Sequence, residues 1–132
     1  MKALPLRIGP DEDLRRALEA WGGDAAFVVA GIGSLHAASL RFAGRKEAQV
    51  LEGPLEILTL SGSLSPDGAH LHMSVSDSAG KVSGGHVGYG CRVRTTAEVL
   101  LADLPGWSFT RERDAATGYP ELVVQSRPAG EE

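Results

Sequence analysis

The chain has 132 residues, which is enough for one domain of ordinary size and too few for two. Its formal net charge is −4, so it lacks the basic excess that attracts phosphates, and nucleic-acid binding is disfavoured. The single cysteine, Cys91, excludes an intrachain disulfide, and no apolar run is long enough for a bilayer span or a secretory leader, so we expect a cytoplasmic protein with no membrane role.

The first third of the chain predicts a strand, a helix and two further strands. Residues 2–8 form the opening strand. A helix begins at Gly9-Pro10-Asp11, because proline and acidic residues suit a first helical turn, and it ends at Gly22-Gly23. Its apolar face consists of Leu14, Ala17, Leu18 and Trp21. Residues 25–32 and 35–42 are assigned to strands, the first of them buried.

The middle of the chain alternates between apolar and polar residues, which is typical of strands with one buried and one wet face. In the strand over residues 56–64, the predicted buried positions are Leu58, Leu60 and Leu64. The predicted wet positions of that strand are Thr59, Ser61 and Ser63. A turn follows at residues 65–68, where proline presets φ and glycine accepts a positive φ.

The next strand, residues 69–76, has the same alternation. Its predicted buried residues are Leu71, Met73 and Val75, and its predicted wet residues are His70, His72, Ser74 and Ser76. A second turn at residues 77–80 leads into a returning strand over residues 81–87. The two strands therefore predict a hairpin.

The C-terminal third predicts three more strands. Residues 92–101 alternate between apolar and polar side chains, which predicts a strand. A helix that begins at Thr96 is the rival interpretation. Residues 107–111 and 122–125 form a final pair. We assign residues 1–125 to a single domain and residues 126–132 to a frayed tail. One clear helix among many short strands predicts a compact α+β domain rich in antiparallel sheet.

Three of the four histidines lie in this predicted hairpin. His70 and His72 are two residues apart, so in a strand they share one face, about 6.5–7 Å apart. His86 follows Gly84-Gly85 on the returning strand. Three histidines with an open position are the pattern of catalytic zinc, whereas the competing interpretation makes His70 and His72 ordinary polar residues on a hydrated sheet.

The position of His86 depends on the register of the hairpin. If the turn closes symmetrically about Ser78-Ala79, His86 pairs with Leu71 and lies on the buried face. A shift of one residue reverses every later side chain of the returning strand. A metal site at all three histidines therefore requires either a bulge near Gly84-Gly85 or a turn with an odd number of residues.

Several segments in sequence order resemble the PPC domain, the domain named for plants and prokaryotes. They are GIGSLHAASLR (31–41), LEGPLEILTLSGSLS (51–65), HLHMSVSDSAGKVSGGH (70–86) and TTAEV (95–99), and GPDEDLRRAL fits the opening helix. The resemblance covers about residues 5–125. It implies a compact α+β fold related to that of acetolactate decarboxylase, a zinc enzyme with three histidine ligands.

The resemblance also implies a homotrimer and a metal, zinc or another divalent transition metal, at His70, His72 and His86. Plant members bind DNA through AT-hook segments and use this domain for self-association and partner binding. No Arg-Gly-Arg-Pro hook occurs here, so the DNA-binding role does not transfer and remains only a weak third hypothesis. The segment from Gly53 to Ile57 lacks the basic and aromatic residues of plant members, which puts the plant type of partner in doubt.

Two function classes remain open. The first is a homotrimeric binding or regulatory module that recognises a protein or a small molecule. The second is a zinc-dependent lyase or hydrolase that acts on a small carbonyl compound. In that case Glu56 is the candidate general acid/base or the partner of a metal ligand, against the alternative of a surface carboxylate at a strand end.

Overall fold

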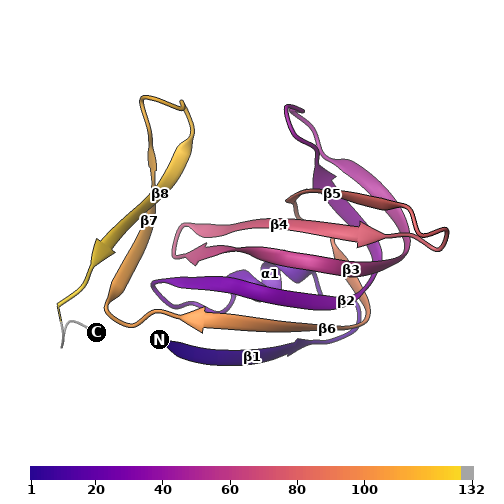
Figure 1. The fold of residues 1–132 in the computed structure, drawn as a ribbon, viewed down its shortest axis with the longest axis horizontal. Coiled ribbons are helices and arrows are strands. Elements are labelled where there is room, and N and C mark those ends of the chain that lie inside the picture. The colour runs from indigo at the N-terminus through magenta and orange to yellow at the C-terminus, as the bar shows by residue number, and fades with distance from the viewer. Residues whose placement is uncertain (129–132) are drawn as a thin grey trace.

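The computed structural model describes residues 1–128, which contain eight strands and one short helix (Figure 1). The elements are β1 (Lys2–Ile8), α1 (Leu14–Glu19), β2 (Ala26–Arg41), β3 (Gln49–Ser65), β4 (Gly68–Ser76), β5 (Val82–Val87), β6 (Arg92–Asp103), β7 (Trp107–Arg113) and β8 (Pro120–Ser126). All strand pairs are antiparallel. The predicted sheet-rich domain with one N-terminal helix is therefore confirmed.

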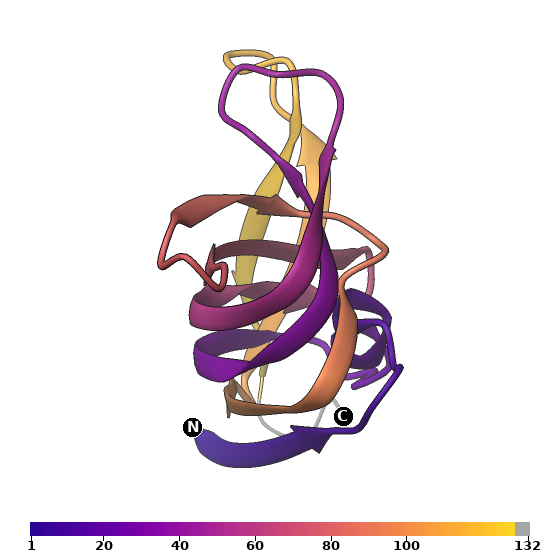
Figure 2. The same cartoon turned by 90° about the vertical axis from the view of Figure 1, so that its right-hand side faces the viewer.

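Six of the strands form one strongly curved sheet in the order β1-β6-β2-β3-β4-β5. The end of β2 also pairs with β5, through Leu40 with Val87 and Arg41 with His86, so four strands close on themselves (Figure 2). The strands β7 and β8 form a separate two-stranded sheet. This closure brings the histidine-bearing strands β4 and β5 next to the long central strand β2.

The helix α1 is shorter than predicted. Asp13 caps it by accepting a hydrogen bond from the Arg16 backbone N–H at 3.0 Å, so the helix begins at Leu14 and not at residue 9. Asp11 has a positive φ of 68°, which is incompatible with a helical first turn at that position. Leu14 and Leu18 are completely buried against the sheet, as the predicted apolar face requires.

The strand β2 joins two segments that we predicted as separate strands. Register shifts within it keep the pairing with β3 and β6 continuous past the glycines. In β3, a bulge between Ile57 and Thr59 reverses the alternation, so Leu58 is 44% exposed and Ile57 is buried. The prediction that Leu58 is a core residue was wrong for this reason.

Ser63, which we predicted on the wet face of β3, is only 5% exposed. The strand predicted over residues 92–101 is confirmed as β6, and the rival helix from Thr96 is not formed. The predicted frayed tail begins too early, because Ser126 belongs to β8 and the Arg127 N–H donates to Gly106 at 2.7 Å. Residues 129–132 of that tail lie outside the described residues. Within residues 1–128, no helix has the length and apolar composition needed to cross a membrane.

Candidate metal centre

The turn between β4 and β5 determines which face carries His86. It contains five residues, 77 to 81, because Ser76 pairs with Val82. The Asp77 carboxylate accepts hydrogen bonds from the N–H groups of Ala79 and Lys81, both at 2.9 Å, and Gly80 adopts a positive φ of 79°. Of the two conditions that we predicted for a shared face, the odd-length turn is met, and no bulge occurs at the two glycines.

This register brings the three predicted histidines together. His72 and His86 lie directly opposite each other, and His70 is two residues away on the same face of β4. The ring centroids are 5.1 Å apart for His70 and His72, 5.3 Å for His70 and His86, and 6.0 Å for His72 and His86. One nitrogen of each ring lies within 4.8 Å of the others.

Gly85 permits the close approach of β2 to this cluster. A Cβ atom at this position would lie 2.7 Å from the Arg41 carbonyl oxygen, which is closer than a side chain tolerates. The absence of a side chain therefore allows Arg41 to pair with His86 and β5 to dock on β2. The Gly-Gly-His segment serves strand closure, and the closure holds His86 in place.

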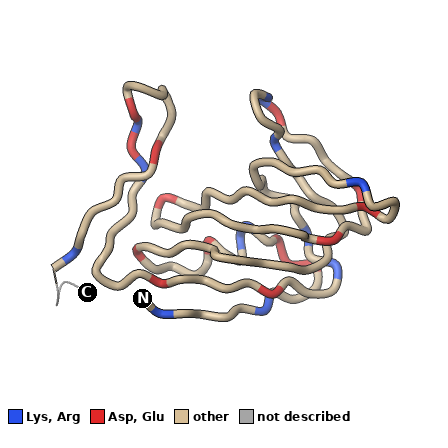
Figure 3. The backbone as a smooth tube through the Cα atoms, viewed as in Figure 1, with Lys and Arg blue, Asp and Glu red and all other residues tan. Residues whose placement is uncertain are grey.

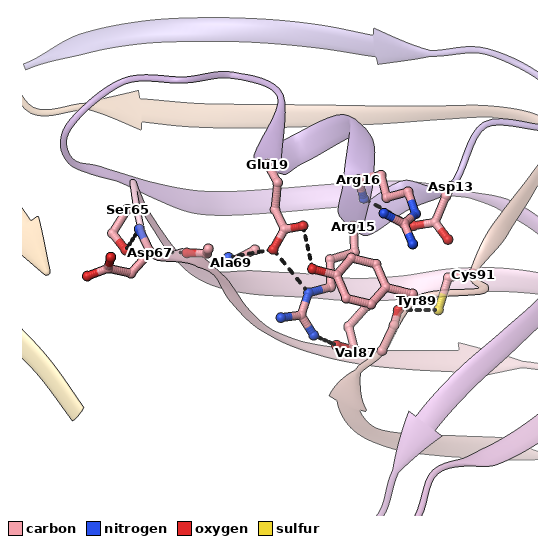
Figure 4. A network of polar contacts seen from close by, with 12 residues as sticks. Asp13, Arg15, Arg16, Glu19, Ser65, Asp67, Ala69, Val87, Tyr89 and Cys91 are labelled. Atoms are coloured by element: carbon pink, nitrogen blue, oxygen red, sulfur yellow. Dashed lines mark hydrogen bonds and ion pairs between the residues drawn. The ribbon is translucent and has the colours of Figure 1, made fainter. Parts of the chain in front are cut away.

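The helix α1 fixes the backbone next to His70 and next to His86, through the contacts of Glu19 and Arg15 that Figure 4 shows. The Glu19 carboxylate accepts the Ala69 N–H at 3.0 Å, next to His70, and the Tyr89 hydroxyl at 2.7 Å. Arg15, which pairs with Glu19 at 3.3 Å, donates to the Val87 carbonyl at 3.0 Å, next to His86. One ion pair on α1 thus connects the strand that carries His70 to the strand that carries His86.

His70 and His86 lie in an environment that favours their neutral form. Burial and the charge of Arg111 lower the pKa of His70. Burial, followed by the charge of Arg41 and the neighbouring His70, lowers the pKa of His86 to about 4. Neither β4 nor β5 contains a lysine, arginine, aspartate or glutamate, so these charges come from other elements (Figure 3). Neutral imidazoles are the form that binds a metal.

Two hollows border the cluster, and His70 and His72 line both of them. The first, of about 310 Å³, also contains Arg111 from β7 and Glu121 from β8. The second, of about 380 Å³, contains His86 and Arg41. Sequence reasoning missed Arg111 and Glu121, since both lie far along the chain and in a sheet with no strand pairing to β4.

Glu56, the predicted acid/base residue, does not lie with the histidines. Glu56 is exposed in β3 and pairs with Ser76, at the end of β4 that is far from His70. It lines a different hollow together with Ser34 and Thr95. The bulge at Leu58 changes which residues of β3 share a face, so the alternation of residues alone could not predict the position of Glu56. Glu121 is the carboxylate that lines a histidine hollow. The fourth histidine, His36, also lies apart, at 3.5 Å from the Asp11 carboxylate.

The donor set fits a divalent transition metal. Tetrahedral zinc places its nitrogen ligands about 2.0–2.1 Å from the ion, and therefore roughly 3.3 Å from one another. The nitrogens here lie within 4.8 Å, so small side-chain rotations bring them to a common ion. His72 is exposed, which leaves an open side to the cluster. Three imidazoles and one open position match zinc better than the hard cations, which take oxygen ligands.

Residues 1–105 match the model of the Plants and Prokaryotes Conserved (PCC) domain, which is the PPC domain that the sequence motifs resemble. The chain belongs to this family. As a sequence, this PPC-domain chain is 47% identical over 129 residues to the bifunctional protein GlmU of Synechococcus sp. (strain JA-2-3B'a(2-13)). The match covers 95% of this chain and 20% of the relative, so the chain spans about a fifth of the length of the curated relatives it matches.

Solved structures share the whole fold of this PPC domain. A hypothetical protein from Salmonella enterica superimposes with a TM-score of 0.93 and 37% identity, over 96% of this chain and 95% of that chain. A metal-containing protein from Archaeoglobus fulgidus superimposes with a TM-score of 0.77 and 29% identity, over 93% of this chain and 94% of that one. Because these matches cover more than nine-tenths of the chain, they extend beyond residue 105.

Proposed function

We propose that this PPC domain holds zinc or another divalent transition metal through His70, His72 and His86, and that it works as a binding or regulatory module. The convergence of three imidazoles on one face of the β4–β5 hairpin carries the proposal. The similarity to a metal-containing protein adds support. When bound, a metal of this kind supplies an open coordination position that can take an oxygen atom of a ligand.

Elemental analysis by mass spectrometry tests the metal directly. We expect about one transition-metal ion per chain in the native protein and less than about a tenth of that in His72→Ala, because two imidazoles hold zinc poorly. His36→Ala is the matched control, since this histidine lies outside the cluster, and it should keep the metal. A native protein that binds no metal even after reconstitution with zinc would contradict the proposal.

We further propose that the module is a homotrimer. Large apolar side chains are exposed along the outer face of β2 and its neighbours, namely Phe27, Val29, Ile32, Leu58 and Leu100. Such a surface is typical of a face that is covered by another subunit. Multi-angle light scattering should give three times the chain mass of 13.8 kDa. A monomer at micromolar concentration would refute this part.

A metal-dependent lyase or hydrolase of a small carbonyl compound is the second candidate. The observation that favours it is the hollow of about 310 Å³, in which Arg111 and Glu121 accompany two of the histidines. Glu121 takes the place of Glu56 as the carboxylate that could move a proton there. Turnover of a small carbonyl substrate that is lost in both His72→Ala and Glu121→Gln would favour the enzyme over the module.

A further inference from the structure

Arg111 is held in position from two sides. Its guanidinium Nη2 donates to the Ser63 hydroxyl at 2.7 Å, and its backbone N–H donates to the Asp67 carboxylate at 2.8 Å. Ser63 is buried in β3, so the hydroxyl that accepts this bond is itself fixed. An arginine that bridges two sheets in this way has lost much of its rotamer freedom before any ligand arrives.

The guanidinium nevertheless has unused binding capacity. Arginine has five N–H donors in a rigid fork, and Ser63 takes one of them. Among residues 1–128, no carboxylate oxygen lies within 4.0 Å of the Arg111 guanidinium, although Glu121 lines the same hollow. A half-buried cation without an acidic partner is uncommon, because burial of a charge costs free energy unless it is paired.

The hollow has the size and the lining of a small-molecule site. Its volume of about 310 Å³ is near the lower end of the range for ligand pockets. Phe27 and Leu122 provide apolar walls. The polar lining groups are Ser61, Ser63, His70, His72, Arg111 and Glu121.

We infer that Arg111 anchors a ligand subsite beside the three histidines, and that this subsite binds the carboxylate of a small organic acid. The planar guanidinium fork matches a carboxylate in a bidentate geometry that a neutral amide cannot reproduce. A ligand held there reaches toward His70 and His72 with its other end. The inference deepens the proposed function and rests on it for one contact only, that between the ligand and a metal ion at the histidines.

A purely structural role for Arg111 is the alternative, in which it only ties β7 to β3 through Ser63. The two roles differ in what a substitution changes. Loss of a structural tie weakens every ligand equally and lowers the unfolding midpoint, whereas loss of a carboxylate anchor removes the preference for an acid over its amide. The discriminating quantity is therefore a ratio of two dissociation constants.

Titration calorimetry with pyruvate and with pyruvamide measures this ratio on the zinc-loaded chain. We expect the wild type to bind pyruvate at least about tenfold more tightly, as a charge-assisted pair predicts. Arg111→Gln should bring the ratio to about one while the zinc content stays unchanged. Arg113→Gln is the matched control, because Arg113 is an exposed arginine of the same strand that does not line the hollow, and it should keep the ratio.

A wild type with no preference for pyruvate, or Arg111→Gln with an unchanged preference, would overturn the inference. If Arg111→Gln does not fold, Arg111→Lys decides the matter, because lysine keeps the charge but not the fork. We expect its ratio to fall about threefold or more, and an unchanged ratio would overturn the inference. The same titrations on chelator-treated protein measure the ratio of the two dissociation constants without a metal. A chain that never binds zinc would refute the metal site, but the ratio on the zinc-free protein would still decide the role of Arg111.

Discussion

The β4–β5 hairpin and the β7–β8 hairpin both contribute side chains to the hollow beside the histidines, but they are held in different ways. The first is part of the six-stranded sheet, and its inward residues Leu71, Met73 and Val75 are among the most buried in the protein. The second forms a sheet of its own and buries mainly Phe109, which meets Phe27 edge to face at 5.6 Å.

The histidines and Arg111 are therefore held in position by different contacts. The positions of the histidines follow from the packing of the main core and from backbone pairing, so they persist as long as the domain is folded. The position of Arg111 depends on a few contacts between the two sheets. A change in the second hairpin should therefore alter ligand preference without releasing the metal, whereas a change in the core beneath the first should weaken both.

The largest effect is expected from Leu71→Ala, because Leu71 is 1% exposed between His70 and His72. Removal of a buried leucine leaves a cavity and should lower the free energy of unfolding by about 3 kcal/mol. Urea unfolding of the zinc-free protein measures this loss. Val82→Ala in the same hairpin is the control, since Val82 is 57% exposed, and it should cost less than about 1 kcal/mol. Equal losses would contradict the assignment of Leu71 to the core.

A smaller and more local effect is expected from Phe109→Ala. Loss of this ring removes the main apolar contact of the second hairpin, so amide exchange in β7 and β8 should become at least about tenfold faster. The zinc content should stay at the wild-type value, and the preference for pyruvate over pyruvamide should disappear. Loss of zinc in this variant would show that the two hairpins are not energetically separate.

The smallest effect concerns the ion pair that connects the two histidine strands. Burial alone would raise the pKa of Glu19, but hydrogen bonds from Ala69 and Tyr89 and the charge of Arg15 lower it overall. A carboxyl group whose pKa is lower in the folded state contributes stability above its unfolded pKa, and this contribution is lost as the pH falls through the folded pKa.

Glu19→Gln should therefore cost about 1 kcal/mol at pH 7 and should lose less additional stability than the wild type when the pH is lowered toward 3. Urea unfolding at several pH values between 7 and 3 measures both quantities. Glu47→Gln, in an exposed loop, should follow the wild-type pH dependence. If Glu19→Gln shows that same dependence, the carboxylate does not contribute in its charged form.

Much of the fold could be predicted because strand alternation and turn residues act over a few positions. The segments over residues 69–76 and 92–101 alternate clearly, and both are strands. The prediction failed where an interaction outside the local window changed the pattern. The bulge at Leu58 reversed the parity of β3. Backbone hydrogen bonds of Asp11 and Glu12 with Val93 keep the first residues of the predicted helix over 9–22 out of the helix.

The alternation of residues 69–76 is enough to place His70 and His72 on one face of a strand, since a period of two residues requires no partner. The rest of the site depends on contacts between segments that are far apart in the chain. The side on which His86 lies depends on the five-residue turn and on the closure of β5 against β2, and both involve pairing between separate segments. The placement of Arg111 beside the histidines, and of Glu56 away from them, depends on how two sheets and a bulge are arranged in space, which no local pattern encodes.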